Sequence, residues 1–260
     1  MVKFEYIIKA INEDLSKSHQ HLRFNKNCLP TFNKFHEETC GEKPRKREKA
    51  IITDKDGNII FTRTDNKKRE VDIGWDEIAE YTMNTGNEVY ITHNHPSDNW
   101  RLPVASLSRA DMDCLTSNYM EWDKQAQDFK RIYPIKSISM ESPNGSRMTI
   151  VRGDNFDVEK NKDFRKASDF LYDAYRIYKD SYNREYENII MDALENDSPI
   201  RQKFVDADDY EGWDAYCHKQ VQNKLGRFEQ TENFKNAQKY FRENNCKLTM
   251  DYPFEYTIEI

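Results

Sequence analysis

Apolar residues along the chain change their spacing twice, and the changes divide it into three regions. From about residue 3 to residue 20 they recur every three or four positions, which is typical of an amphipathic helix. Between residues 46 and 155, short β-rich runs alternate with helical stretches. Beyond residue 156 the helical spacing returns. The pattern predicts an N-terminal helix and basic linker over 1–45, a core over 46–155 and a helical region over 156–260 that closes with a β-strand.

The central region predicts hairpins, helices and a strand in alternation. The first hairpin turns at Asp56–Gly57 and the second at Asn144–Gly145, both strong hairpin signals. Between them lie a short helix that Gly86 ends and the strand NEVYITHNH. A further helix begins at the serines near residue 106 and carries Met112, Leu115, Tyr119 and Trp122 at helical spacing.

The C-terminal region carries three stripes of apolar and aromatic residues at helical spacing. Their members are Leu171, Tyr175, Tyr178, Tyr182, Tyr186 and Ile189; Cys217, Val221, Leu225 and Phe228; and Phe234, Ala237 and Phe241. Such stripes usually face a core, and a partner-binding surface on the helices of 160–245 is the alternative. The final segment, CKLTMDYPFEYTIEI, alternates and predicts a strand that returns to the sheet. The fold class is therefore α+β, a mixed β-sheet core flanked by helices, with an additional α-helical C-terminal region.

Composition narrows the classes of function. The chain has 260 residues, 33% of them charged, and a net charge of −6, so we expect neither nucleic acid nor an acidic membrane as a partner. The basic cluster Lys43–Lys49 is interpreted as a linker. Five scattered cysteines without a C-x-x-C pair indicate a reducing compartment. With no signal peptide and no apolar span, we expect a cytoplasmic protein.

Two histidines at the end of the central strand are the main candidates for chemistry. His93 and His95 are two positions apart, and because side chains alternate on a strand they point to one side and can share an ion. Pro96 ends the strand, which places both histidines at the rim of the sheet. Ser108-x-x-Asp111 then opens a helix. Asp111 would complete a set of two histidines and one carboxylate, which catalytic zinc uses while leaving a fourth position for water.

A zinc-bound water also needs a base. Glu48, just before the first strand of the sheet, is the best placed carboxylate, with Glu42 and Glu70 as fallbacks. Ser108 could equally be an N-cap and Asp111 a first-turn carboxylate favoured by the helix dipole. Cysteine nucleophiles are disfavoured, and Cys114 and the pair Cys217–His218 are interpreted as core or surface groups. The remaining histidines, His19, His21 and His36, have no third ligand near them in sequence.

Glu48, THNHPS at 92–97 and SRAD at 108–111 together resemble the JAMM (MPN+, or JAB) metalloprotease motif, and HNHPS is especially similar to its RadC-type and phage-associated branches. The resemblance covers residues 46 to 155. It implies that His93, His95 and Asp111 hold a zinc ion with one water, that Glu48 is the general base, and that Ser108 stabilises the oxyanion. It also implies a protein or peptide substrate, cut at a peptide or isopeptide bond after a ubiquitin-like C-terminus.

The chain departs from the family pattern between His95 and Asp111. Fifteen residues separate them, more than the family has, and Asp98 replaces the usual glycine. The longer loop carries Trp100 and Leu102, which we expect beside the metal, where they could cover the site or grip a partner. It also leaves Asp113 as a second choice of ligand and Asp98 as a third.

Two classes of function follow. The first is a zinc-dependent metalloprotease or isopeptidase. The second is a non-catalytic or weakly catalytic binding or assembly protein of a phage or mobile element, including a toxin or counter-defence effector, that uses the same scaffold. A zinc deaminase is disfavoured because the sequence lacks the Pro-Cys-x-x-Cys ligand pair.

Overall fold

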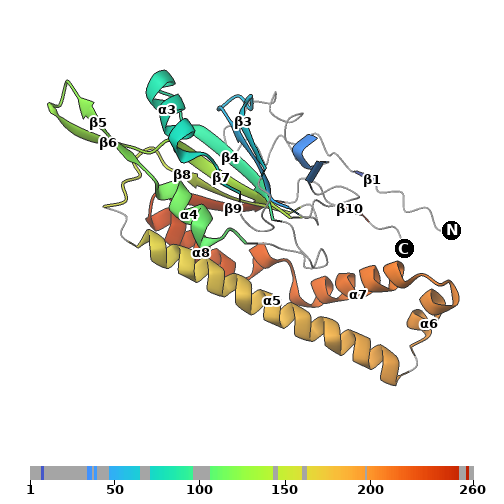
Figure 1. Cartoon of the computed structure of the whole chain (residues 1–260). Helices are drawn as coiled ribbons and strands as arrows, with labels where there is room; N and C mark the ends of the chain where they lie inside the picture. The colour runs from blue at the N-terminus through green and yellow to red at the C-terminus, as the bar shows by residue number, and fades with distance from the viewer. Residues whose placement is uncertain are drawn as a thin grey trace.

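The computed structural model describes ten segments of the chain. They are residues 7–8, 34–36, 38–39, 47–64, 71–95, 106–142, 146–159, 163–196, 198–251 and 256–257. These segments form a mixed α+β fold with a central sheet, helices packed on it and a helical C-terminal region, as the sequence predicts (Figure 1).

The central sheet has six strands in the order β3-β2-β4-β7-β8-β9. Their bounds are β2 Lys49–Thr53, β3 Ile59–Thr64, β4 Val89–Asn94, β7 Ile135–Glu141, β8 Arg147–Arg152 and β9 Cys246–Asp251. Only β4 and β7 run parallel, and every other pair of neighbours is antiparallel. Two small sheets lie outside it: β1 (Ile7–Ile8) with β10 (Tyr256–Thr257), and β5 (Tyr119–Asp123) with β6 (Asp128–Ile132).

The helices fall into two groups along the chain: two lie before β7, and four lie between β8 and β9. Their bounds are α3 Trp75–Thr85, α4 Arg109–Thr116, α5 Phe164–Glu195, α6 Pro199–Asp206, α7 Tyr210–Leu225 and α8 Glu232–Glu243, with a 3-10 turn η2 at Phe228–Gln230. The long helix α5 packs against α7 and α8, and α8 packs against β9 (Figure 1). None of the helices in the described segments is long and apolar enough to cross a membrane.

The core forms on one face of the sheet. Register pairs place one apolar residue from each of five strands in a row across it: Ile52, Ile91, Ile138, Ile150 and Leu248. One continuous cluster joins this row to apolar side chains of α3, α4, α5 and α8. Burial of such side chains stabilises by roughly 1.5–3 kcal/mol each, so this row fixes the register of the sheet.

The predicted stripes of the C-terminal region face the core. Phe234, Ala237 and Phe241 of α8 are fully buried, and so are Cys217 and Val221 of α7. The closing strand prediction is confirmed over Cys246–Asp251, which pairs with β8 and so joins the sheet built by the central region.

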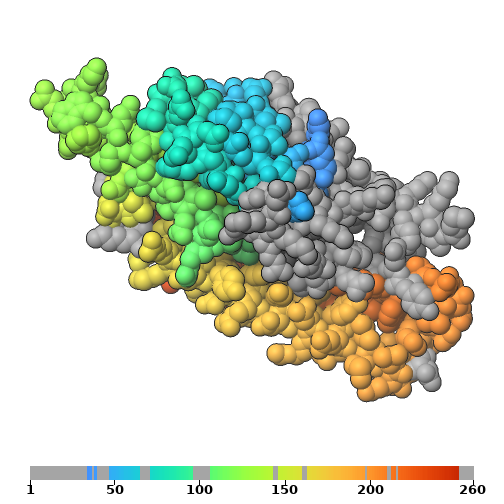
Figure 2. All heavy atoms as spheres, viewed as in Figure 1, coloured from blue at the N-terminus to red at the C-terminus, as the bar shows by residue number. Residues whose placement is uncertain are grey.

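The helix predicted to run from residue 106 past Trp122 is wrong in its second half. It ends at Thr116 with Ser117 as C-cap, and Tyr119 and Trp122 belong to the hairpin β5–β6. The turn forms because the Asp123 carboxylate accepts the amides of Gln125 and Ala126. Helical spacing was misleading because tyrosine and tryptophan also suit a strand, and cross-strand pairing, which places Trp122 opposite Phe129, decided the outcome. The hairpin projects from the body of the molecule (Figures 1 and 2).

The other predicted elements fall as follows. The first hairpin turns where expected, with Gly57 at φ 80°, although the connection spans Asp54–Asn58 and is longer than a two-residue turn. Gly86 ends α3 at φ 70°. The strands of the second hairpin are β7 and β8, whereas its turn at Asn144–Gly145 lies outside the described residues. The helix predicted over 3–20 is wrong at Ile7–Ile8, its two described residues, because pairing with Tyr256–Thr257 makes them strand β1.

Candidate metal centre

The three predicted ligands come together at one end of the sheet. His93 lies at the end of β4, His95 follows directly after it, and Asp111 lies in the first turn of α4. One ligand atom from each of these three residues lies within 4.8 Å of the other two. Among the described residues this is the one such group of histidine, cysteine and carboxylate side chains.

The S-x-x-D sequence explains why the Asp111 carboxylate faces the histidines. Ser108 caps α4: its Oγ accepts the Asp111 amide at 3.2 Å, and the Asp111 carboxylate accepts the Ser108 amide at 2.6 Å. This reciprocal capping box fixes the side-chain rotamer of Asp111. The motif that starts the helix therefore also aims the ligand.

The distances between ligand atoms suit a small ion. His93 Nε2 lies 3.0 Å from His95 Nε2 and 3.2 Å from Asp111 Oδ1, and His95 Nε2 lies 3.7 Å from Asp111 Oδ2. Tetrahedral zinc with ligands at about 2.0–2.1 Å requires separations of about 3.3 Å. The three side chains thus fit zinc in both chemistry and spacing.

The electrostatics of the metal-free cluster are unequal between the two histidines. Burial alone would lower the pKa of His93, but the charge and hydrogen bond of Asp111 outweigh burial and raise it. Burial and repulsion from His93 lower the pKa of His95 to about 4. Burial would raise the pKa of Asp111, yet attraction to both histidines and the bond from Ser108 lower it. Without metal, His93 therefore holds a proton more strongly than His95 does.

Glu48 lies beside the histidines. The register of β2 and β4 pairs Ala50 with His93. Continued by two residues, it brings Glu48 opposite His95 on the same face of the sheet. Glu48 is 8% exposed, and its charge acts on His93. Because its charge acts on His93 and it stands outside the group of three ligands, Glu48 is the described carboxylate that best suits the role of a base.

A residue that sequence reasoning missed stands between the two histidines. Asn94 is 1% exposed and points to the opposite face from them. Its Oδ1 accepts the Lys49 amide at 2.7 Å, and its Nδ2 donates to the Arg47 carbonyl at 3.4 Å. In the sequence it is merely the variable position of H-x-H, and the register of two strands was needed to find it.

A buried charge network was also missed. Glu141, at the end of β7, pairs with Asn94 in the ladder and bonds to Arg147, and His36 Nδ1 lies 3.3 Å from it. Burial would raise the pKa of Glu141, but Arg147 and His36 lower it. His36, set aside from metal binding, holds the N-terminal segment to the strand next to the histidines.

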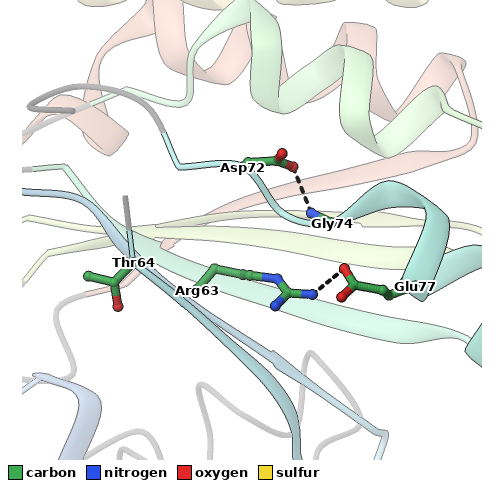
Figure 3. A pocket seen from close by; sticks show the side chains of 5 residues that line it. All are labelled: Arg63, Thr64, Asp72, Gly74 and Glu77. Atoms are coloured by element: carbon green, nitrogen blue, oxygen red, sulfur yellow. Dashed lines mark hydrogen bonds and ion pairs between the residues drawn. The ribbon is translucent and has the colours of Figure 1, made fainter. Parts of the chain in front are cut away.

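An open pocket of about 300 Å³ lies at the same end of the sheet. Its lining residues are Arg63, Thr64, Asp72, Gly74 and Glu77 (Figure 3). Arg63 forms an ion pair with Glu77. In the sheet, Ala50 of β2 has Arg63 of β3 opposite it on one side and His93 of β4 opposite it on the other.

The remaining predicted candidates are placed as follows. Asp113 is exposed and stands apart from the ligand group. Burial, followed by the charges of Asp111, Asp113 and Asp72, raises the pKa of Cys114 to about 11, which disfavours a thiolate there. Trp100, Leu102, Asp98, Glu42, Glu70 and the basic cluster up to Lys46 lie outside the described residues.

A second polar cluster with a histidine lies between α5 and α7. Tyr182 Oη is 2.7 Å from His218 Nδ1, Tyr186 donates to Asp214, and His218 Nε2 lies 3.7 Å from Asp214 Oδ2. Both tyrosine rings stack on the imidazole. The cluster contains a single histidine and a single carboxylate, and a tyrosine hydroxyl forms a hydrogen bond with each of them.

Comparison with known proteins gives no relative for this site. No family model matches the chain, and no curated protein or solved structure matches it.

Proposed function

We propose that the protein is a zinc-dependent hydrolase that cleaves a peptide or isopeptide bond. The observation that carries this proposal is the convergence of His93, His95 and Asp111 on one point, with the buried Glu48 close enough for its charge to act on His93. Two histidines and one carboxylate leave a coordination position for water, as catalytic zinc sites require.

The residues divide the work of hydrolysis among them. Zinc, when bound, supplies a water whose pKa is near 7 and polarises the substrate carbonyl. Glu48 would take the proton of that water and deliver it to the leaving amine. Ser108 Oγ is the acceptor in its bond with the Asp111 amide, so its own O–H hydrogen is available to the oxyanion.

The substrate class rests on the JAMM resemblance. A bond after a ubiquitin-like C-terminus is our first choice, because the chain carries Glu48, H-x-H and S-x-x-D in the order of that motif. The pocket beside Arg63 would accept residues that flank the bond. Trp100 and Leu102 are proposed to contact the substrate from the long loop.

The test separates metal binding from chemistry. Purified protein should bind about one zinc equivalent, and the loaded protein should cleave a peptide or a ubiquitin-like fusion. Glu48→Gln should retain zinc and lose turnover by more than about 100-fold, since it removes the base. Glu80→Gln is the matched control: it neutralises an exposed carboxylate of α3 that lies outside the pocket lining, and should keep both zinc and turnover. A wild-type protein that binds no zinc would refute the proposal.

The helices of 160–245 are proposed to bind a protein partner, and one observation favours this role. Large apolar side chains are exposed where α5 meets α6, namely Met191, Leu194, Ile200 and Val205. Such a patch is typical of an interaction site. If hydrolysis is absent although zinc is bound, a binding or assembly role for the whole chain becomes the better explanation. Charged substitutions at Met191 and Leu194 should then abolish partner capture and leave zinc binding intact.

A further inference from the structure

A side chain joins the segment that carries the base to the strand that carries the two histidines. Glu48 lies outside strand β2, which begins at Lys49, and the main-chain pairing between β2 and β4 ends at Ala50 and His93. Beyond this pair, a side-chain contact connects the residues on either side of Glu48 to β4.

The side chain of Asn94 provides that contact. Its amide has the same donor and acceptor as a peptide group, and it continues the ladder where the main chain stops. Oδ1 accepts the amide of Lys49 at 2.7 Å, and Nδ2 donates to the carbonyl of Arg47 at 3.4 Å. These two bonds fall on the residues before and after Glu48, so they fix both sides of its backbone.

Asn94 is also held firmly itself. It is 1% exposed, lies between the two histidines on β4 and pairs with Glu141 on the neighbouring strand. Its amide would lose two hydrogen bonds in a buried place if the segment around Glu48 moved away. The residue at the centre of H-x-H therefore joins the ligand strand to the segment that carries the base.

We infer that Asn94 is a positioning residue, which sets the place of the Glu48 carboxylate relative to His93 and His95. This inference rests on the proposed function for the role of Glu48 as a base. The brace itself is a property of the chain and does not depend on turnover.

A double-mutant cycle on zinc affinity tests the brace without a substrate. A carboxylate near the ion strengthens zinc binding, so Glu48→Gln should weaken it, by about tenfold if it acts as an outer partner. In the background of Asn94→Leu, which keeps size and removes both bonds, the same change should alter zinc affinity less than about twofold. Equal effects in the two backgrounds would overturn the inference.

Two further measurements complete the test. Asn94→Leu should accelerate hydrogen exchange at the Lys49 amide, while Thr92→Val, on the same strand and face, should not. Where the loaded protein hydrolyses a substrate, Asn94→Leu should lower kcat much more than it raises KM, and should add nothing to Glu48→Gln. Coupling in the zinc cycle without any hydrolysis would uphold the brace and reject the proposed function. Failure of the wild type to bind zinc would reject the proposed function, and equal hydrogen exchange at the Lys49 amide in Asn94→Leu and Thr92→Val would then reject the brace as well.

Discussion

Two clusters in this molecule bring a histidine and an aspartate together, and their hydrogen bonding differs. At the sheet rim, the Nε2 atoms of His93 and His95 face each other at 3.0 Å, and Asp111 approaches both. Between α5 and α7, tyrosine hydroxyls accompany the histidine and the carboxylate: Tyr182 meets His218, and Tyr186 donates to Asp214.

The difference supports the proposal that the rim cluster holds an ion, whereas the cluster between α5 and α7 stabilises the fold. Hydrogen-bond acceptors that converge without enough donors, as in the rim cluster, need a shared proton or cation. This is the electrostatic condition for metal binding. Acceptors that alternate with hydroxyl groups, as His218 Nδ1 and Asp214 Oδ1 do, form hydrogen bonds within the protein and contribute to a specific packing of helices. A histidine next to an aspartate therefore indicates a metal only when the surrounding donors are missing.

The largest expected difference concerns zinc itself. His93→Ala or His95→Ala should lower zinc affinity by more than about 100-fold, since loss of an outer partner alone costs 10–100-fold. His218→Ala should leave zinc affinity unchanged. Competition with a coloured chelator measures both values, and comparable losses in all three variants would erase the distinction between the clusters.

The opposite result is expected for stability. Tyr182→Phe removes the hydroxyl that lies 2.7 Å from His218 Nδ1, and should lower the free energy of unfolding by about 1–3 kcal/mol without affecting zinc. Urea denaturation gives the value. Tyr172→Phe, which changes an exposed tyrosine of the same helix, is the control and should have almost no effect.

The rim cluster should give the metal-free protein a pH optimum of stability near the ordinary histidine pKa of 6.5. The pKa of His95 is lowered to about 4, so the unfolded chain binds more protons below 6.5 and this contribution is lost as pH falls toward 4. The pKa of His93 is raised, so its contribution is lost as pH increases above 6.5. The lowered pKa of Asp111 adds a further loss below about 3.8.

Urea midpoints measured from pH 4 to pH 8 on chelator-treated protein would show this optimum. His95→Gln should flatten the acidic side between pH 6.5 and 4 and leave the loss above pH 6.5. An unchanged profile in that variant would mean that other groups determine the acid sensitivity.

The smallest expected effect compares two capping serines. Ser108 and Ser198 both accept an amide at a helix start, at 3.2 and 3.4 Å. Replacing either by alanine should cost about 1 kcal/mol in unfolding free energy. Only Ser108→Ala should also lower turnover, because only that serine lies beside the ligands. Equal turnover in the two variants would leave Ser108 as a cap alone.

Much of the fold could be predicted because its signals are local. Gly57 and Gly86 mark a turn and a helix end by their left-handed backbone, and the stripe of Phe234, Ala237 and Phe241 faces the core as its period requires. The hairpin at Tyr119–Ile132 could not be predicted, because its residues suit both a helix and a strand and the choice depends on pairing with Phe129 and its neighbours.

The candidate site divides in the same way. His93, His95 and Asp111 were found from spacing, since strand alternation and a capping motif act over a few residues. Asn94 and Glu141 could not be found from the sequence. The partners of Asn94 lie 45 or more positions away. Glu141 bonds to a residue of the next strand and to His36, which lies 105 positions away. Long-range bonds leave no periodic trace in a sequence.

The length of α5 has a consequence for how the molecule moves in solution. Its 32 residues make a rod of about 48 Å, more than twice the roughly 20 Å that a strand of the sheet spans. Rotational diffusion should therefore be anisotropic, slow about axes across the rod and faster around it. Nuclear spin relaxation would detect this in the backbone amides of α5, and a bend at the Tyr182 level would appear as a loss of that anisotropy.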